Sequence, residues 1–355
     1  MAPLFQQPFM SGGFPSMNRA GGAGGAVGGW VELGRTTLGS ASSTIDVTGL
    51  ADKRYYMILG NTLGRSAVSD NSFLRMGNGS FDSSSSYSIR RSINGGADIT
   101  YSSQNKAFSV YEPSNNPNFM IGYLANKSNK EKLMLNFHIN QNATGSSNVP
   151  IRNEYVQKHS FTSNPIDQIQ FLTNNADTFN SGSEVVVLGY DPSDTHTTNF
   201  WEELASVEAD GSSTDMSSGT ITAKKYLWIQ LYQKGIAGDV RLRFNSDSGN
   251  NYNRRYNQNG VADNTDGSAQ HISNMIGLGS TPSFGNAFII NNASNEKLVM
   301  GHHVQQNAAG AGSTPQRIEF VGKWANTSNQ ITNVNILSSS GNFPSGSILK
   351  VWGAD

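Results

Sequence analysis

Short runs in which apolar and polar residues alternate dominate this chain, and no long stretch shows the 3.6-residue period of an amphipathic helix. In residues 132–139 a more polar set alternates with four apolar residues, Leu133, Leu135, Phe137 and Ile139. Successive side chains on a strand point to opposite faces, so this pattern predicts a β-strand that buries its apolar face. Clusters of Ser, Asn, Asp and Gly separate the runs, as is typical of turns between strands.

The chain contains a tandem duplication. Matching text recurs in the same order, for residues 53–59 with 224–230, 131–133 with 296–298, 141–143 with 306–308, and 181–183 with 345–347. Each copy is far longer than a solenoid repeat of about 20 to 50 residues, so each is a whole domain. We predict an all-β protein of two tandem β-sandwich domains, jelly-roll-like, at residues 30–191 and 201–355, joined by a linker at 192–200. Residues 201–207 are the one place where a helical turn is expected.

The last strand of each copy has a shared face and a divergent face. Val185 and Val187 match Leu349 and Val351, which indicates a common core-facing side. On the outward side of copy two lie Ile348 and Trp352. An apolar patch of this kind needs a partner, so we expect Ile348 and Trp352 to pack on copy one or on a neighbouring subunit.

Residues 1–29 belong to neither copy. Residues 21–29 are almost all Gly and Ala, which predicts a flexible hinge. Six apolar residues precede the hinge without a helix or strand period: Leu4, Phe5, Phe9, Met10, Phe14 and Met17. Ordering a residue costs about 1 to 2 kcal/mol while burying a Phe yields about 1.5 to 3, so these side chains need a pre-formed groove. We expect an assembly arm that docks on a neighbouring subunit. A frayed terminus is the alternative.

Composition limits the classes of partner. Only 14% of residues are charged and the formal net charge is −1, so no global electrostatic attraction to nucleic acid or to an anionic membrane is expected. The chain has no cysteine, which excludes disulfides and thiolate metal sites. No run of 18 apolar residues and no secretory signal is found.

Candidate chemistry is sparse. His302 and His303 are adjacent on a predicted strand and therefore point to opposite faces, so they cannot share a metal ion. Residues 245–249 resemble the start of a calcium loop, but Tyr256 stands where such a loop has its glutamate, and a hairpin turn is favoured. No P-loop, no Gly-x-Ser-x-Gly elbow and no distinctive carboxylate pair occurs. We predict no enzyme activity, no cofactor and no metal site.

Charged residues at matched positions of the two copies are more informative. The pairs are Arg75 with Arg243, Arg90 with Arg255, Asp98 with Asp263, Arg152 with Arg317, Glu154 with Glu319 and Lys158 with Lys323. We interpret them as ion pairs or hydrogen bonds within each domain, with Arg152 and Glu154 on one strand face. The alternative is a polar groove for carbohydrate, with candidate glycan contacts at Tyr252, Arg255, Tyr256 and Trp324.

Several strings resemble a repeated β-domain in virion proteins of marine tailed bacteriophages. They are WVELGRTTLGS at 30–40, SGSEVVVLG at 181–189, LRFNSDSGNNY at 242–252 and VGKWANTSNQI at 321–331. The resemblance covers both copies and implies a virion structural role, without catalytic residues. Copy one departs from the pattern at residues 77–82, where another turn replaces the Asn-x-Asp-x-Gly sequence.

The sequence therefore predicts a structural virion protein, a capsid decoration or tail and appendage component, that assembles as a homo-oligomer through its N-terminal arm. The expected partners are other copies of the chain and other virion proteins, and the expected location is the virion. Two alternatives stay open: a receptor- or glycan-binding virion protein that attaches to a host surface glycan, and a double jelly-roll major capsid protein. The second alternative is less favoured because the two halves of such capsid proteins rarely keep this much sequence similarity to each other.

Overall fold

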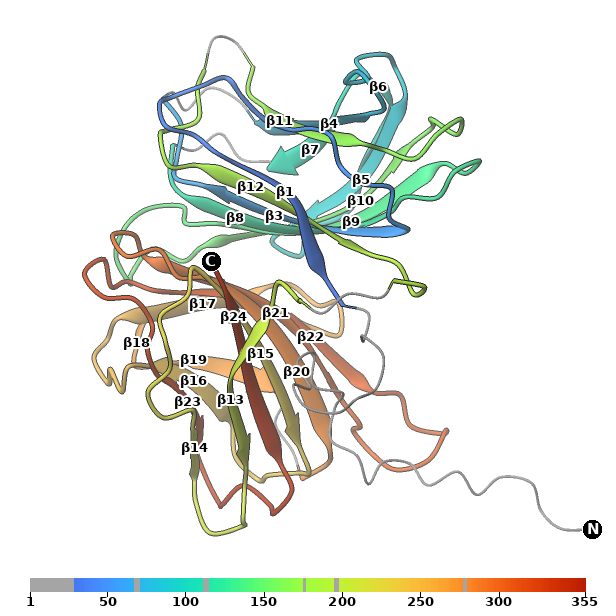
Figure 1. The fold of residues 1–355 in the computed structure, drawn as a ribbon. Helices are drawn as coiled ribbons and strands as arrows, with labels where there is room; N and C mark the ends of the chain where they lie inside the picture. Colours follow the sequence, from blue (N-terminus) through green and yellow to red (C-terminus); the bar gives the residue numbers. More distant parts are fainter. Residues whose placement is uncertain (1–28, 67–70, 111–114, 175–176, 195–197, 277–279) are drawn as a thin grey trace, which may run out of the picture.

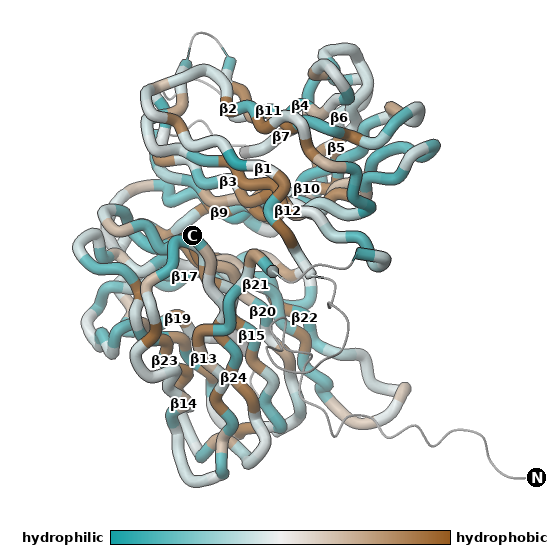
Figure 2. The backbone as a smooth tube through the Cα atoms, viewed as in Figure 1, coloured by the Kyte–Doolittle hydropathy of each residue, from teal (hydrophilic) through white to brown (hydrophobic). Residues whose placement is uncertain are grey.

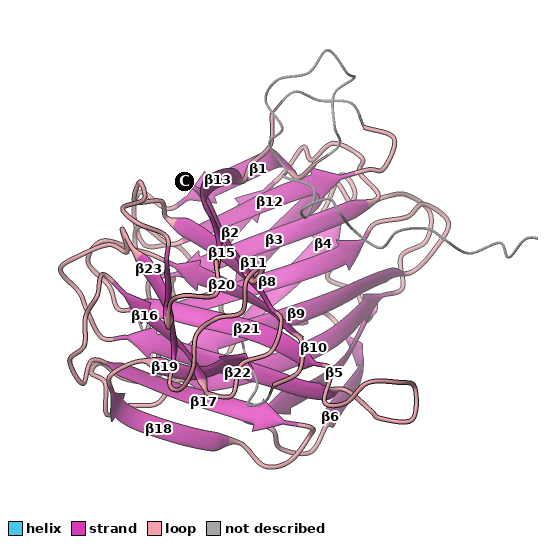
Figure 3. Ribbon diagram, turned by 90° about the horizontal axis from the view of Figure 1, so that it is seen from below, coloured by secondary structure: helices cyan, strands magenta, loops and turns pink. Residues whose placement is uncertain are grey.

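The computed structural model describes residues 29–66, 71–110, 115–174, 177–194, 198–276 and 280–355, and these form antiparallel strands and loops (Figures 1 and 3). Within these ranges there is no helix long and apolar enough to cross a membrane. The chain folds into two successive sandwiches, each made of one sheet of eight strands and one of four. The predicted pair of tandem β-sandwich domains is confirmed.

Copy one contains β1 to β12. Its eight-stranded sheet runs in the order β1 (Val31–Thr37), β12 (Glu184–Tyr190), β3 (Tyr55–Thr62), β8 (Asn118–Ala125), β9 (Lys132–Asn140), β10 (Ile151–His159), β5 (Tyr87–Ile93) and β6 (Ile99–Gln104). Its four-stranded sheet runs in the order β2 (Thr44–Val47), β11 (Gln168–Leu172), β4 (Ser72–Gly77) and β7 (Ala107–Val110).

Copy two repeats this arrangement strand for strand. Its eight-stranded sheet runs in the order β13 (Glu202–Glu208), β24 (Ile348–Ala354), β15 (Tyr226–Gln233), β20 (Ser283–Ile290), β21 (Lys297–Gln305), β22 (Gln316–Trp324), β17 (Tyr252–Gln258) and β18 (Asn264–Ala269). Its four-stranded sheet runs in the order β14 (Asp215–Ser217), β23 (Val334–Ser338), β16 (Val240–Phe244) and β19 (Ile272–Ile276). The helical turn expected at 201–207 is wrong, because Glu202–Glu208 pairs with β24 as an edge strand.

Each sandwich has its own apolar core between its two sheets. In copy one, Val185 and Val187 of β12 face this core together with Phe171 and Met76 of the four-stranded sheet. In copy two, Leu349 and Val351 of β24 occupy the matching positions. The core-facing side predicted for the last strand of each copy is therefore correct.

The face of β9 that lines the sandwich differs from the prediction. Leu133 and Leu135 are exposed on the outer side of the sheet, whereas Met134 and His138 point inward. The inner polar groups are hydrogen-bonded: His138 Nε2 lies 3.1 Å from Asn118 Oδ1, and Asn153 Nδ2 donates to His138 Nδ1 at 3.0 Å. Buried polar groups with partners are tolerated in a core, so an inner face of a sheet need not be its more apolar face. His303 of copy two, expected on the opposite side from the core, is likewise buried.

Candidate docking surface between the two copies

The outer face of each eight-stranded sheet, the face turned away from its own sandwich core, has two halves that the strand register defines. In copy one, the half beside the β9–β10 loop carries Leu59, Ile121, Phe137 and Glu154 in one cross-strand row and Asn61, Phe119, Ile139 and Arg152 in the next. We call this the loop half. The half beside the β8–β9 turn, the turn half, carries Tyr55, Ala125, Leu133 and Lys158, followed by Met57, Tyr123, Leu135 and Val156.

The duplication gives copy two the same two halves. Its loop half carries Gln230, Asn286, His302, Glu319, Tyr232, Phe284, Val304 and Arg317. Its turn half carries Tyr226, Ile290, Leu298, Lys323, Trp228, Phe288, Met300 and Val321.

The two copies bind mainly through unlike halves. One buried apolar cluster joins Leu59, Phe119, Ile121 and Ile139 from the loop half of copy one to Tyr226, Phe288, Leu298, Met300 and Val321 from the turn half of copy two. Figure 2 shows hydrophobic segments of the chain where the two sandwiches meet. The contact also includes matched positions of both copies, since Phe137 packs on His302 with ring centroids 4.3 Å apart and both Leu188 and Trp352 belong to the cluster.

Aromatic side chains of copy two lie at the centre of this contact. Trp228 stacks on Phe288 with ring centroids 5.3 Å apart, and Trp201 and Trp352 pack around it at 5.6 and 6.4 Å. Trp352, which we expected to need a partner, is buried here against copy one. Ile348 lies at the other end of β24, half-buried and outside the cluster. Only Trp352 of the two predicted residues belongs to the contact.

The loop of residues 141–150 of copy one holds copy two mainly through main-chain atoms. Lys323 Nζ donates to the carbonyl oxygen of Ala143, and Asn253 Nδ2 donates to those of Ser146 and Asn148 at 3.1 and 2.8 Å. Beneath the loop, Lys323 Nζ lies 2.9 Å from Glu296 Oε2, and both side chains are buried. Burial lowers the pKa of Lys323, although Glu296 opposes this shift.

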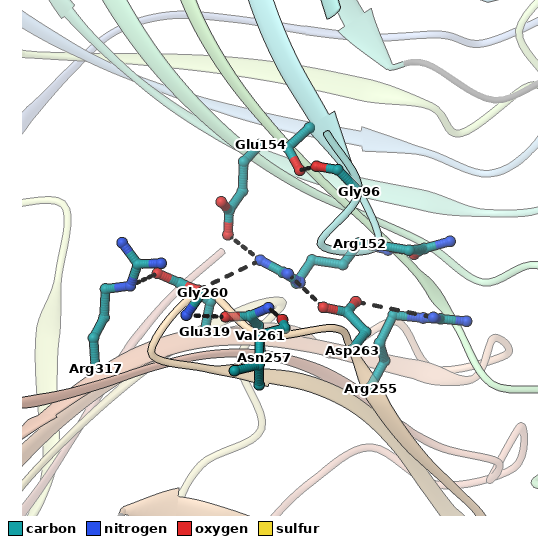
Figure 4. A network of polar contacts seen from close by, with 12 residues as sticks. Gly96, Arg152, Glu154, Arg255, Asn257, Gly260, Val261, Asp263, Arg317 and Glu319 are labelled. Carbon is teal, nitrogen blue, oxygen red and sulfur yellow. Dashed lines mark hydrogen bonds and ion pairs between the residues drawn. The ribbon is translucent and has the colours of Figure 1, made fainter. Parts of the chain in front are cut away.

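An ion-pair network adjoins the loop (Figure 4). Arg152 contacts Glu154 of its own copy, and its Nη2 lies 2.7 Å from Asp263 Oδ1 of copy two. Glu319 Oε2 lies 3.8 Å from Arg152 Nη1. Burial alone would lower the pKa of Arg152, but the three surrounding carboxylates outweigh it and raise the pKa. Burial also raises the pKa of Glu319, and the charge of Glu154 adds to that shift.

These contacts correct the interpretation of the matched charges. The expected pairing of Arg152 with Glu154 within copy one is present, but Arg152 also joins the two domains through Asp263, which we did not expect. Register along one strand identifies neighbours within a sheet and says nothing about a second sheet packed on it. Sequence reasoning also missed Glu184, a buried carboxylate of copy one that accepts a hydrogen bond from the Tyr226 hydroxyl of copy two at 2.6 Å. One feature of the sequence could have identified Glu184: it is a charged residue among the apolar, outward-facing residues of the last strand, and copy two has Ile348 at the matching position.

The turn half of copy one carries the same residue types, but apart from Met57, which joins the buried cluster, much of it stays exposed. Four of its apolar side chains, Tyr55, Leu133, Leu135 and Val156, are 40–57% exposed, whereas their counterparts Tyr226, Leu298, Met300 and Val321 are at most 3% exposed. Lys158 and Glu131 form the pair that matches Lys323 and Glu296, but on the surface. A groove of about 530 Å³ lies in this half, with Trp30, Tyr55, Tyr123, Leu133, Leu135 and Tyr190 in its wall.

The candidate glycan contacts do not form an exposed groove. Tyr252 and Trp324 are buried in the core of copy two, where their rings stack 6.3 Å apart. Tyr256 is half-buried beneath the guanidinium of Arg254, and Arg255 Nε donates to the Pro150 carbonyl oxygen at the domain contact. The prediction for Tyr252 and Trp324 is wrong. Both residues lie beside turns, but they occupy strand positions whose side chains point to the inner face of the sheet.

The six arm residues, Leu4 to Met17, lie outside the described residues. At residues 245–249, the Asp247 carboxylate accepts hydrogen bonds from the Gly249 amide at 2.8 Å and from Trp324 Nε1 at 2.7 Å, so it serves a turn. Across the described ranges, no three His, Cys, Asp or Glu side chains gather as a metal site requires.

Comparison with known proteins adds little. No protein-family model matches the chain, and no curated protein matches it. Among solved structures, domains LG4-5 of the mouse laminin alpha1 chain are similar with 11% identity, a TM-score of 0.21, and coverage of 99% of this chain and 93% of that one. The attachment invasion locus protein Ail of Yersinia pestis is 6% identical with a TM-score of 0.12, covering 81% of this chain and 99% of its own. Likenesses this weak support no functional argument.

The contrast between the two turn halves leads to a matched prediction. We expect Leu298→Ala to lower the free energy of unfolding by about 2 to 5 kcal/mol, because it leaves a cavity in the buried contact. Leu133→Ala, at the same position of copy one, should change it by no more than about 0.5 kcal/mol in dilute solution because Leu133 is exposed. Urea unfolding of both variants measures the difference. Equal losses would contradict the assignment of Leu298 to a domain contact.

Proposed function

We propose that this chain is a structural protein of a tailed-phage virion, a capsid decoration or tail and appendage component that assembles as a homo-oligomer. The single observation that carries the proposal is the exposed part of the turn half of copy one, with Tyr55, Leu133, Leu135 and Val156. It keeps the apolar residues and the charged pairs that are buried when the same surface binds a partner in copy two. An exposed apolar patch of this kind marks a site that another protein covers.

Two further observations support an assembly role. The sequence resembles repeated β-domains of virion proteins, and Arg152 of the docking surface forms an ion pair with Asp263 of the other domain. The N-terminal arm provides a second contact in this proposal. Host attachment through a glycan is not put forward, because two of the four side chains chosen for it lie in a core.

Quantitative mass spectrometry of density-purified particles of the encoding phage tests this function. We expect the chain at a fixed copy number per particle, in proportion to the major capsid protein or to a tail protein. Labelled antibodies against the chain would then place it on the capsid or the tail in electron micrographs. Its absence from purified particles, with presence in the infected cell, would overturn the virion role.

A further inference from the structure

We propose that the N-terminal arm of one chain fills the groove in the turn half of copy one on a second chain, and that two chains exchange their arms in this way. The inference rests on the proposed function and joins its two contacts into one, because the arm is then the partner that covers the exposed residues. The arm is assigned to a second chain because Tyr55, Leu133, Leu135 and Val156 remain 40–57% exposed within a single chain.

Aromatic rings form much of the groove wall. Trp30 lies 5.7 Å from Tyr190 and 6.4 Å from Tyr123, measured between ring centroids. Tyr55 stacks on Tyr190 at 6.3 Å. Exposed apolar side chains of β9 and β10 complete the wall around a volume of about 530 Å³. None of the described residues that line the groove is Asp, Glu, Lys, Arg or His. Such a wall favours an apolar, uncharged occupant.

The arm has the matching chemistry. Residues 1–20, MAPLFQQPFMSGGFPSMNRA, contain a single charged side chain, Arg19, and each phenylalanine lies within two residues of a proline. Proline-rich segments dock in aromatic-lined grooves because their extended backbone is already restricted before binding and loses little entropy. The arm therefore combines rings that an aromatic groove can bury with a backbone suited to lie along it.

The arm joins the described chain at the edge of this groove. The described residues begin at Gly29, and the next residue, Trp30, lies in the groove wall. Residues 21–28 are Gly and Ala apart from Val27, and a segment of this length spans at most about 28 Å. When the grooves of two chains face each other, each arm starts beside its own groove and within reach of the other. Reciprocal exchange of identical segments is a low-cost route to a closed dimer.

The matching surface of copy two shows that a surface of this type binds phenylalanine from another domain. Tyr226 and Phe288 of copy two stand at the positions of Tyr55 and Tyr123. The ring of Phe119 from copy one packs on Tyr226 with centroids 6.1 Å apart, and Phe119, Tyr226 and Phe288 all belong to the buried cluster between the domains. In copy two this surface is therefore filled within the chain, which leaves the groove of copy one for the arm.

Two variants of the full chain each remove one side of the contact. Leu135→Asp places a charge in the groove at an exposed position. The combined change Phe5→Ser, Phe9→Ser and Phe14→Ser removes the rings of the arm. We expect the wild-type chain to form dimers in sedimentation velocity between about 1 and 100 µM. Each variant alone should dimerise more than about 100-fold more weakly, because a dimer of identical variants loses both exchanged contacts at once.

An equimolar mixture of the two variants separates arm exchange from other modes of association. The groove variant carries a wild-type arm and the arm variant a wild-type groove, so a mixed pair retains one intact contact. We expect heterodimers that dissociate more readily than wild-type dimers. A mixture that stays monomeric would contradict the inference, as would dimers that persist in Leu135→Asp. Ser340→Asp adds the same charge at an exposed position of copy two and should dimerise like the wild type. Thermal unfolding in dilute solution should be equal for every variant.

Disulfide trapping identifies which chain supplies the arm, since the chain has no cysteine of its own. When a Phe9→Cys variant and a Leu133→Cys variant are mixed and oxidised, we expect a disulfide-linked heterodimer. Ser340→Cys in place of Leu133→Cys is the matched control and should give only the product of random collisions. If a chain with both Phe9→Cys and Leu133→Cys closed its disulfide within one monomer, the groove would belong to its own arm and the exchange would be wrong.

Failure of the arm exchange and failure of the virion role are distinguishable. A chain that is present in purified particles but does not dimerise through its arm would overturn this inference and leave the virion role standing. Absence of the chain from purified particles would overturn the virion role without affecting the dimer in solution.

Discussion

Replacing Arg152 with glutamine should lower the free energy of unfolding by about 3 to 5 kcal/mol, because it leaves Asp263 as a buried carboxylate without its nearest counter-charge. Arg152 Nη2 lies 2.7 Å from Asp263 Oδ1, and both side chains are at most 6% exposed. Arg255 also lies near Asp263, at 3.9 Å, but is too distant to replace the hydrogen bond from Arg152 Nη2. The variant should therefore separate the two domains before either sandwich unfolds.

The duplication provides a matched control for this experiment. Arg317 is the same residue at the same strand position of copy two, but its side chain is 62% exposed. Arg317→Gln should cost no more than about 1 kcal/mol at concentrations where the chain is monomeric. Urea unfolding followed by tryptophan fluorescence is suitable, since four of the five tryptophans belong to copy two. Similar losses for Arg152→Gln and Arg317→Gln would contradict the role of Arg152 between the domains.

Lys323→Met is the second substitution with a large expected effect. Lys323 and Glu296 form a buried pair at 2.9 Å beneath the loop of residues 141–150, and removing the cation leaves the carboxylate buried with the Gly145 amide as its remaining donor. We expect a loss of about 3 to 5 kcal/mol in the free energy of unfolding. Adding Glu296→Gln should recover part of that loss, because the second change removes the uncompensated charge.

The matched control is again at the equivalent position of copy one. Lys158 and Glu131 form the same pair at 3.0 Å, but their side chains are 47% and 42% exposed. Lys158→Met should cost about 0 to 1 kcal/mol in dilute solution, as exposed ion pairs do. The same urea titration measures both variants. If Lys158→Met lowered the free energy of unfolding as much as Lys323→Met does, burial by the loop would not explain the strength of the Lys323–Glu296 pair.

Alternation and internal repetition predicted most of the fold. Many strands, such as residues 132–139, could be predicted because apolar and polar residues alternate along them. The duplication could be predicted because the same short sequences recur in the same order in both copies. What alternation cannot provide is the identity of the neighbour that covers each face. The two faces of β9 have different neighbours. The four-stranded sheet covers the face that carries Asn136 and His138. Copy two covers the loop half of the opposite face, and Leu133 lies outside that half. Local pattern holds no information about that choice.

The docking surface was only partly predictable for the same reason. Matched charges such as Arg152 and Arg317 were recognisable as constrained positions, and Trp352 was recognisable as needing a partner. Their partners lie more than 100 residues away, and reaching them required the packing of one sheet on another. Tyr252 and Trp324 show the converse error, because aromatic residues beside turns are equally compatible with a binding surface and a core.

The main-chain character of the contact at residues 141–150 has a consequence for how this protein can change over time. Carbonyl oxygens supply most of the hydrogen-bond acceptors of this contact. Natural variation can therefore change the side chains of the loop without loss of these hydrogen bonds, provided that the backbone conformation is kept. Selection at this contact therefore acts on loop length and on the few residues that set the path, Asn142, Gly145 and Pro150. Two related proteins could exchange domains across this contact even after their loop sequences had diverged beyond recognition.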